Sequence, residues 1–159
     1  MRVAVITVDT QVYRNQKEDT TSEVIQEYLG QKEGVSIIFK KALPNDTKVI
    51  ATILQRMADG QLADLVLTTG GAGCGPEDIT PEATLSIVER PIYGIPEAMR
   101  AYTLQKTPRA MINRSAAGIR KNTLIVNLPG KPKAAKSALH YLYPVLEHTV
   151  KIIGSGADD

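Results

Sequence analysis

The sequence predicts an α/β fold with a largely parallel sheet that is covered by helices on both faces. Short, continuous apolar runs rich in Val, Ile and Leu recur along the chain, as in strands buried on both faces. Segments with apolar residues at helical spacing lie between these runs, which gives the β-α-β-α-β order of a parallel sheet. No internal repeat or linker interrupts the 159 residues, so we expect a single domain over residues 1–159.

The first half of the chain alternates between predicted strands and helices. Three apolar runs are predicted as strands, at residues 3–8, 35–42 and 65–69. Residues 20–23 (Thr-Thr-Ser-Glu) fit a capping box, and the helical spacing after them predicts a helix that ends at Gly30. After a loop and cap at residues 44–47, the apolar stripe from Val49 to Met57 predicts a second helix.

The second half is predicted to add more helices and one strand. Thr80 is a good N-cap and Pro81 a good first helical residue, so a helix is expected from there to about residue 89. Another helix should begin at Pro96, and residues 123–128 form an apolar run typical of a strand. A helix is expected over residues 133–143, a kink or restart at Pro144, a last amphipathic segment to residue 153, and a frayed tail at 154–159.

Composition and charge narrow the class of protein. Cys74 is the single cysteine and therefore has no intrachain disulfide partner, and the N-terminus lacks signal-peptide features, so we expect a cytoplasmic protein. No apolar run is long enough to span a bilayer, and no membrane partner is expected. Residues 98–146 contain nine Lys and Arg residues and no Asp or Glu, which suggests an anionic partner or a solvated basic face. Nucleic acid is not expected, because stacking aromatics are not interleaved with these basic residues.

The chemistry should lie beyond the carboxyl ends of the strands, where ligands collect in open α/β sheets. Asp9, residues 69–78 and residues 129–132 follow three such ends. Glycines in residues 70–78 let the backbone approach an anion closely, although the loop matches neither the Walker A nor the dinucleotide fingerprint and is also compatible with a tight turn. Asp78 is either a partner of the following helix N-terminus or a magnesium ligand. Cys74 has no motif that pairs it with a base, so it is interpreted as a loop filler.

Three ordered blocks resemble the signature of the molybdopterin adenylyltransferase family, which includes the corresponding domain of gephyrin. The first block is residues 68–73 (TTGGAG) followed by residues 76–84 (PEDITPEAT). The second is residues 113–120 (NRSAAGIR), and the third is residues 124–133 (LIVNLPGKPK). The resemblance covers nearly the whole chain and implies a three-layer α/β/α sandwich with a largely parallel central sheet. It also implies a homotrimer that acts on molybdopterin and ATP with Mg²⁺, and a handover of product to a molybdenum-insertion protein.

The resemblance also implies roles for individual residues. Asp78 matches the family's essential aspartate, and Asp46 is the nearest match to a second one, so both are expected to act in catalysis and to bind the metal. The residues expected to bind substrate are Asp9, Thr69, Gly70, Gly71, Gly73, Gly75, Thr80, Arg114, Ser115, Asn127, Pro129, Gly130 and Lys131. Arg120 is a further basic candidate for phosphate contact.

The chain departs from the family pattern at four places. Ala72 stands where the family usually has Thr, and Glu77 where it usually has Arg. The serine that precedes the matching aspartate in the family pattern is absent before Asp9. The family's second essential aspartate normally follows a proline directly, but here Pro44 is followed by Asn45, with Asp46 one place later. These departures leave open an alternative function, a protein that binds and delivers molybdopterin without catalysis. A nucleotide-binding domain of an oxidoreductase is disfavoured by the missing fingerprint.

The expected reaction transfers AMP from ATP to the terminal phosphate of molybdopterin and releases pyrophosphate. That phosphate is already an anion near neutral pH, so no general base is needed to activate it. Catalysis should instead depend on alignment at the α-phosphorus and on neutralisation of charge.

Overall fold

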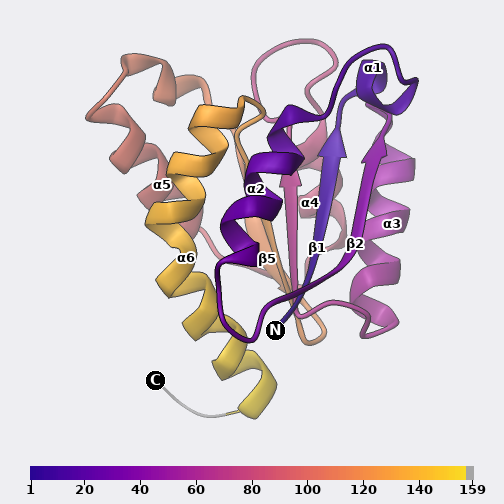
Figure 1. The fold of residues 1–159 in the computed structure, drawn as a ribbon, viewed down its shortest axis with the longest axis vertical. Helices are drawn as coiled ribbons and strands as arrows, with labels where there is room; N and C mark the ends of the chain where they lie inside the picture. The colour runs from indigo at the N-terminus through magenta and orange to yellow at the C-terminus, as the bar shows by residue number, and fades with distance from the viewer. Residues whose placement is uncertain (157–159) are drawn as a thin grey trace.

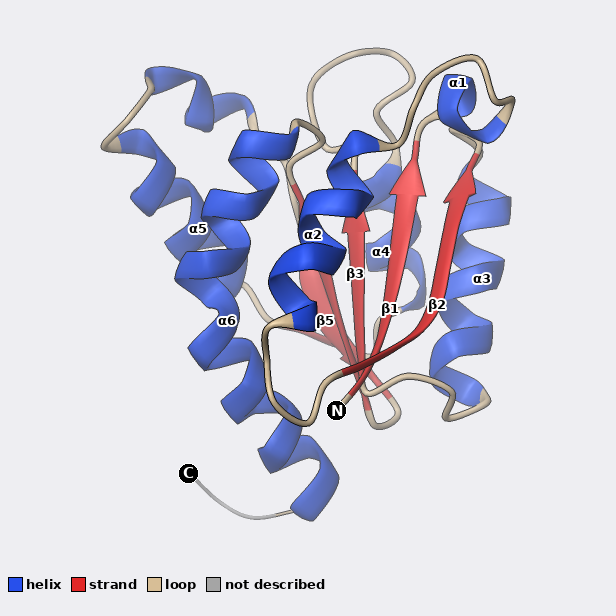
Figure 2. Cartoon of the chain, in the orientation of Figure 1, coloured by secondary structure: helices blue, strands red, loops and turns tan. Residues whose placement is uncertain are grey.

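A mixed, mostly parallel sheet forms the centre of the computed structural model, which describes residues 1–156 (Figures 1 and 2). Within these residues the six strands are β1 (Arg2–Val8), β2 (Ser36–Leu43), β3 (Leu65–Thr69), β4 (Arg90–Pro91), β5 (Ala117–Arg120) and β6 (Thr123–Leu128). Their order across the sheet is β2-β1-β3-β6-β5-β4. β1, β2, β3 and β6 are parallel, whereas β5 is antiparallel to both of its neighbours. The predicted fold class is confirmed.

Helices cover both faces of this sheet. The α-helices are α1 (Thr10–Tyr13), α2 (Thr20–Gly30), α3 (Thr47–Asp59), α4 (Thr80–Ile87), α5 (Gly94–Leu104) and α6 (Pro132–Ser155), and η1 (Pro108–Ile112) is a 3₁₀ helix. One hydrophobic cluster joins the sheet to α2, α5 and α6, and a second joins its other face to α3 and α4 (Figure 2). No helix in the described part of the chain is both long and apolar enough to cross a membrane.

Several element boundaries differ from the sequence-based expectation. Asp19, and not the Thr20 capping box, caps α2 through a hydrogen bond that its side chain accepts from Ser22 N at 3.1 Å. Thr80 is the first residue of α4 and makes no capping bond; its Oγ1 donates instead to Gly70 O at 2.9 Å. α6 continues through Pro144. It also includes residues 154 and 155 of the expected tail, whereas residues 157–159 lie outside the described residues.

The sequence did not predict four short elements, α1, β4, η1 and β5. β5 is only four residues long, and its Ala-Gly-Ile-Arg sequence has no strong strand signal. It pairs with β6 through a tight connection, so its strand conformation depends on that neighbour. Elements this short carry too little periodic pattern to be recognised alone.

The register of the parallel strands brings the predicted site segments together. Thr69 of β3 pairs with Thr7 of β1 on one side and with Leu128 of β6 on the other. The segments that follow these three strands therefore leave the same edge of the sheet side by side. In Figure 1 they lie at the top of the molecule, where α1 also lies.

Candidate active site

Two adjacent cavities open at the carboxyl edge of the parallel strands. The first cavity has a volume of about 540 Å³ and lies among residues 7–12, 17–21 and 69–71, with Asn45 and residues 77–78 and 130–132 completing its wall. The second cavity, of about 510 Å³, lies among residues 71–73, α5, η1 and residues 129–131. Gly71, Asp78, Gly130 and Lys131 line both. Two ligands bound in these cavities would therefore meet at this shared boundary.

The Gly-loop, residues 70–78, runs between the two cavities. Gly70 and Gly71 have φ values of 92° and 69°, a region that side-chain-bearing residues rarely adopt. A Cβ on Gly70 would lie 2.5 Å from Val8 O, and one on Gly130 would lie 3.1 Å from Gly70 Cα. Glycine is thus required both by conformation and by the close approach of the strand ends.

Asp78 is positioned by the Gly-loop itself. Its Oδ2 accepts a hydrogen bond from Gly75 N at 2.8 Å. A Cβ on Gly73 or on Gly75 would lie 2.9 or 3.0 Å from that same oxygen, so both glycines leave room for the carboxylate. Asp78 is consequently held at the boundary of the two cavities.

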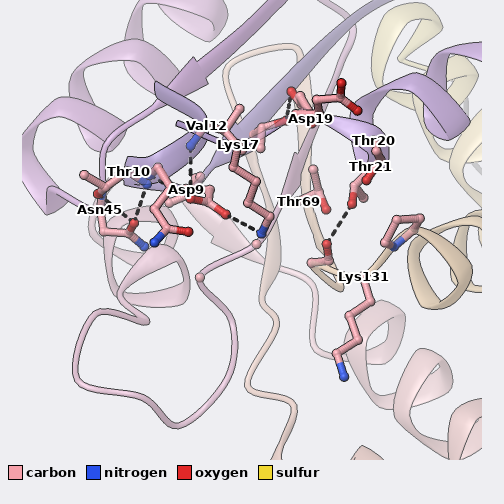
Figure 3. Close-up of a pocket in the computed structure, with 18 of the residues that line it drawn as sticks. Asp9, Thr10, Val12, Lys17, Asp19, Thr20, Thr21, Asn45, Thr69 and Lys131 are labelled. Carbon is pink, nitrogen blue, oxygen red and sulfur yellow. Dashed lines mark hydrogen bonds and ion pairs between the residues drawn. The ribbon is translucent and has the colours of Figure 1, made fainter. Parts of the chain in front are cut away.

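Asp9 and Lys17 form an ion pair in the wall of the first cavity (Figure 3). Asp9 caps α1 by accepting from Gln11 N and Val12 N, and Lys17 Nζ lies 3.0 Å from its other oxygen, Oδ2. Partial burial raises the pKa of the Asp9 carboxyl, but Lys17 and the two backbone donors together outweigh it and lower that pKa. Asp9 is therefore an anion that already has a cationic partner.

Asn45, and not Asp46, lines the first cavity. Asn45 Oδ1 accepts from both the backbone N and the Oγ1 of Thr10 at 2.9 Å (Figure 3). Its Nδ2 donates to Glu77 O at 3.0 Å. Asp46 is exposed and caps α3, with Oδ1 accepting from Lys48 N and Val49 N. The structure thus places the expected second aspartate outside both cavities.

Nine of the predicted site residues line at least one of the cavities: Asp9, Thr69, Gly70, Gly71, Gly73, Asp78, Pro129, Gly130 and Lys131. Gly75, Thr80, Arg114, Ser115 and Asn127 line neither cavity. Gly75 and Thr80 support the Gly-loop through the bonds already described. Ser115 Oγ is buried and has no hydrogen-bond partner among the described residues.

Asn127 is a structural residue in this arrangement. It is fully buried, and its Nδ2 donates to the hydroxyls of Thr68 and Thr84, both at 2.9 Å. Its Oδ1 accepts from Ala116 N at 3.0 Å. All of these partners are protein groups, so Asn127 joins β6 to β3, to α4 and to the residue before β5, and it lines neither cavity.

The two arginines expected to contact phosphate have protein partners. Arg114 donates to Gly73 O and Asp78 O and pairs with Glu82. Arg120 pairs with Asp59 and donates to Ile87 O. Because Arg120 pairs with Thr123 at the start of β6, it lies at the amino-terminal end of the parallel strands, away from the cavities.

Several lining residues were not among the site residues predicted from the sequence. In the first cavity they include Lys17, Asp19, Thr20, Thr21 and Asn45; in the second they include Arg100, Arg109 and Asn113. Thr21 Oγ1 donates to Gly130 O at 2.8 Å, and Thr7 Oγ1 donates to Asp19 Oδ2 at 2.7 Å. For residues 9–19, the sequence signal that could have identified lining residues is their position, because this polar segment directly follows β1.

The charges of the two cavities differ. Asp9, Glu18, Asp19, Glu77 and Asp78 line the first cavity together with Lys17 and Lys131, whereas Arg100, Arg109, Lys131 and Asp78 line the second. No group of three or more His, Cys, Asp or Glu residues within residues 1–156 is arranged to hold a metal by itself. Mg²⁺ usually takes only one or two carboxylates and completes its shell with water and substrate phosphates, so Asp78 fits such an ion as a single protein ligand.

Comparison with known proteins relates this geometry to a family. Residues 4–148 match the family model described as a probable molybdopterin binding domain. The molybdopterin adenylyltransferase of Helicobacter pylori J99 is 34% identical over 154 residues, which cover 96% of this chain and 88% of the relative. Among solved structures, the molybdopterin biosynthesis enzyme MoaB of Thermus thermophilus is 39% identical with a TM-score of 0.89, over 96% of this chain and 95% of that one.

A further structure, the Mog protein of Mycobacterium ulcerans, is 32% identical with a TM-score of 0.88, over 95% of this chain and 97% of that chain. These similarities extend over the strands, the Gly-loop and both cavities, because each match spans nearly the entire chain. The chain therefore contains a probable molybdopterin binding domain and belongs to the molybdopterin adenylyltransferase family.

Proposed function

We propose that the protein is a molybdopterin adenylyltransferase of molybdenum cofactor biosynthesis, which transfers AMP from ATP to the terminal phosphate of molybdopterin. The observation that carries this proposal is the pair of adjacent cavities that share Gly71, Asp78, Gly130 and Lys131. A transfer between two phosphorylated substrates requires two binding spaces whose phosphate ends meet. Family membership supplies the identity of the two substrates.

The residues present suit a reaction that depends on alignment and charge. An oxygen of the molybdopterin phosphate forms a bond to the α-phosphorus of ATP, and the bond from that phosphorus to the bridging oxygen of pyrophosphate breaks. Backbone N–H groups of the Gly-loop and the Lys131 ammonium are the proposed donors to the phosphates. Asp78 is the proposed ligand of Mg²⁺, which would neutralise charge on the leaving pyrophosphate. No side chain is required to remove a proton.

The acidic wall of the first cavity supports a role for a cation. Five carboxylates and two lysines line it, so an anionic phosphate placed there meets net repulsion. A divalent ion between Asp78 and the phosphates would reverse that interaction. Asp46 is not part of this proposal, because it caps α3 and lies outside the cavity.

A homotrimer and a handover of product to a molybdenum-insertion protein are further proposals that rest on the family resemblance. Exposed apolar side chains such as Tyr93, Met111 and Ile112 are available for contact with another copy. Light scattering should give three times the mass of one chain; a monomer or dimer mass would contradict the trimer.

Incubation of the purified protein with molybdopterin and Mg²⁺-ATP tests the proposed activity. We expect adenylylated molybdopterin and pyrophosphate in equal amounts, and neither product when Mg²⁺ is chelated. Stable binding of molybdopterin without either product would instead identify a protein that stores or delivers the pterin.

Asp78→Asn separates the catalytic role of Asp78 from a structural one. Asn keeps an oxygen that can accept from Gly75 N, so the free energy of unfolding should change by less than about 1 kcal/mol. Turnover should fall by about 10²-fold or more, as on loss of one strong transition-state stabiliser, while molybdopterin binding persists. Thermal unfolding and turnover are measured on one preparation. Near-normal turnover in the folded variant would exclude a metal-ligand role.

A further inference from the structure

Arg114 contacts the Gly-loop at two separate places, near its middle and at Asp78. Its backbone N donates to Ala72 O at 2.8 Å, and its Nε donates to Gly73 O at 2.6 Å. One terminal nitrogen donates to Asp78 O, also at 2.6 Å. The segment from residue 73 to residue 78 is therefore closed by one guanidinium, which joins the carbonyl at its start to the carbonyl of Asp78 itself.

Glu82 holds that guanidinium from the opposite side. Glu82 lies in the first turn of α4, and both of its oxygens accept from Arg114. The hydrogen bond from Arg114 lowers the pKa of the Glu82 carboxyl, and the same contact raises the pKa of Arg114. Arg114 thus links the Gly-loop to the helix that follows it, and three of its donor groups are committed to protein oxygens.

We propose that Arg114 is a positioning residue that holds Asp78 at the boundary of the two cavities, and that it does not bind a substrate phosphate. Arg114 lines neither cavity, although Asn113 beside it lines the second. A planar guanidinium can reach Gly73 O, Asp78 O and the Glu82 carboxylate together, because its donors point along fixed and different directions. A lysine ammonium in the same place lacks that fixed fork, so it should not replace the three contacts.

The backbone N–H of Gly75 offers a direct readout of this role. It donates to Asp78 Oδ2, and Asp78 N donates in turn to Gly75 O at 3.0 Å. If Arg114 holds the loop closed, its removal should open these two bonds more often and expose both amides to hydrogen exchange. This readout needs neither substrate nor metal, so it is independent of the proposed adenylyltransferase activity, on which only the turnover measurements rest.

Arg120→Gln is a matched control for Arg114→Gln. Arg120 is the last residue of β5; it pairs with the carboxylate of Asp59 and donates to a backbone carbonyl, that of Ile87. It lies at the other end of β5 and touches no part of the Gly-loop. General loss of an arginine ion pair is therefore common to both variants, whereas loss of the loop contacts is specific to Arg114→Gln.

The experiment compares Arg114→Gln, Arg114→Lys and Arg120→Gln by amide hydrogen exchange. Both Arg114 variants should exchange the Gly75 and Asp78 amides about tenfold faster than the unaltered protein, and Arg120→Gln should not. Glu82→Gln leaves the bonds from Arg114 to Gly73 O and Asp78 O in place, so it should increase the exchange rates by a smaller factor. This variant replaces the Arg114 variants in the test if those do not fold. Unchanged exchange at Gly75 in the folded Arg114 variants would overturn the proposal.

Ligand measurements on the same variants distinguish positioning from phosphate binding. Both Arg114 variants should lower kcat about tenfold and raise the Mg²⁺ concentration needed for half-maximal rate, with KM for molybdopterin nearly unchanged. Binding of metal-free ATP, measured by calorimetry in EDTA, should stay within about threefold. Loss of metal-free ATP binding, or full recovery of kcat by Arg114→Lys, would overturn the positioning role. Faster loop exchange in a protein without any turnover would uphold the positioning role and reject the proposed function.

Discussion

A single amide side chain, that of Asn45, joins three segments at the first cavity. Asn45 follows β2, its partner Thr10 begins α1 after β1, and its other partner, Glu77 O, belongs to the Gly-loop. Thr10 Oγ1 and Asn45 are bonded in both directions, because the Asn45 backbone N also donates to that hydroxyl. An aspartate in this position has no N–H to offer Glu77 O, so the amide supplies a contact that a carboxylate cannot make.

We predict that Asn45→Ala reduces turnover more than Asp46→Asn does. Asn45→Ala removes three hydrogen bonds and loosens the wall of the first cavity, so turnover should fall by about tenfold or more. Asp46→Asn keeps a good helix cap, because Asn and Asp are about equally good caps. The free energy of unfolding should therefore change by less than about 1 kcal/mol. Turnover and thermal unfolding of both variants are compared in parallel. A selective loss of turnover in Asp46→Asn would restore Asp46 as a metal ligand.

At the scale of elements, β5 is a part of the sheet that packs closely against its neighbours. Gly118 of β5 lies under Val88, the residue at the end of α4, and beside Arg90 O of β4. A Cβ at this position would lie 2.8 Å from Val88 Cβ and 3.0 Å from Arg90 O. This close approach lets α4, and with it the end of the Gly-loop, pack onto the antiparallel edge of the sheet.

Gly118→Ala should therefore destabilise the fold by about 1–3 kcal/mol, the usual cost of overpacking a well-filled core. Gly30→Ala provides the control, because Gly30 is the last residue of α2 and a Cβ there would meet no atom within 4 Å. That variant should be neutral or more stable by up to about 1 kcal/mol. Urea unfolding of both variants tests the contrast. Equal stability of the two would mean that β5 moves to accept the methyl group.

At the scale of the whole molecule, ion pairs connect parts of the chain that are far apart in sequence. Three of them are Arg2 with Asp64, Arg120 with Asp59, and Arg114 with Glu82. Hydrogen bonds from Arg120 and Arg114 lower the pKa values of Asp59 and Glu82 below their ordinary values of 3.8 and 4.5. Because these pairs are partly exposed, water and salt screen them and each contributes modestly.

Stability should therefore decrease in acid. A carboxyl whose pKa is lower in the folded state binds fewer protons than in the unfolded chain, so its contribution is complete above about pH 4.5 and is lost as the pH falls through the folded value. We expect the urea midpoint to be nearly constant from about pH 7 to about pH 5 and to fall steadily below about pH 4.5. Asp59→Asn should make the urea midpoint depend less on pH. The midpoints of this variant and of the unaltered protein should be most similar at low pH. A midpoint that does not fall in acid would contradict this account.

Most of the fold could be predicted from the sequence, because the patterns that specify it are local. Continuous apolar runs predicted β1, β2, β3 and β6 to within about a residue of their observed ends, and helical spacing predicted α2 and α3. The predicted strand ends placed Asp78 and residues 129–131 at the carboxyl edge of the sheet, where the structure has its cavities. Glycine density in residues 70–78 predicted either a backbone that can approach an anion closely or a tight turn, and in the structure Gly70 lies close to Val8 O.

Only the tertiary structure decided which polar groups line a cavity and which bond to other parts of the protein. Asn45 and Asp46 are adjacent in sequence, but their side chains have different partners. Asp46 caps its own helix, α3, whereas Asn45 accepts a hydrogen bond from Thr10, 35 residues away. Arg114 donates to the carbonyl of Gly73, which lies 41 residues earlier in the sequence. From the sequence alone, a basic residue in this motif block was interpreted as a phosphate ligand, because its protein partner could not be identified. Apolar periodicity is encoded within a few neighbouring residues, whereas hydrogen-bond partners are chosen by chain segments that meet only after folding.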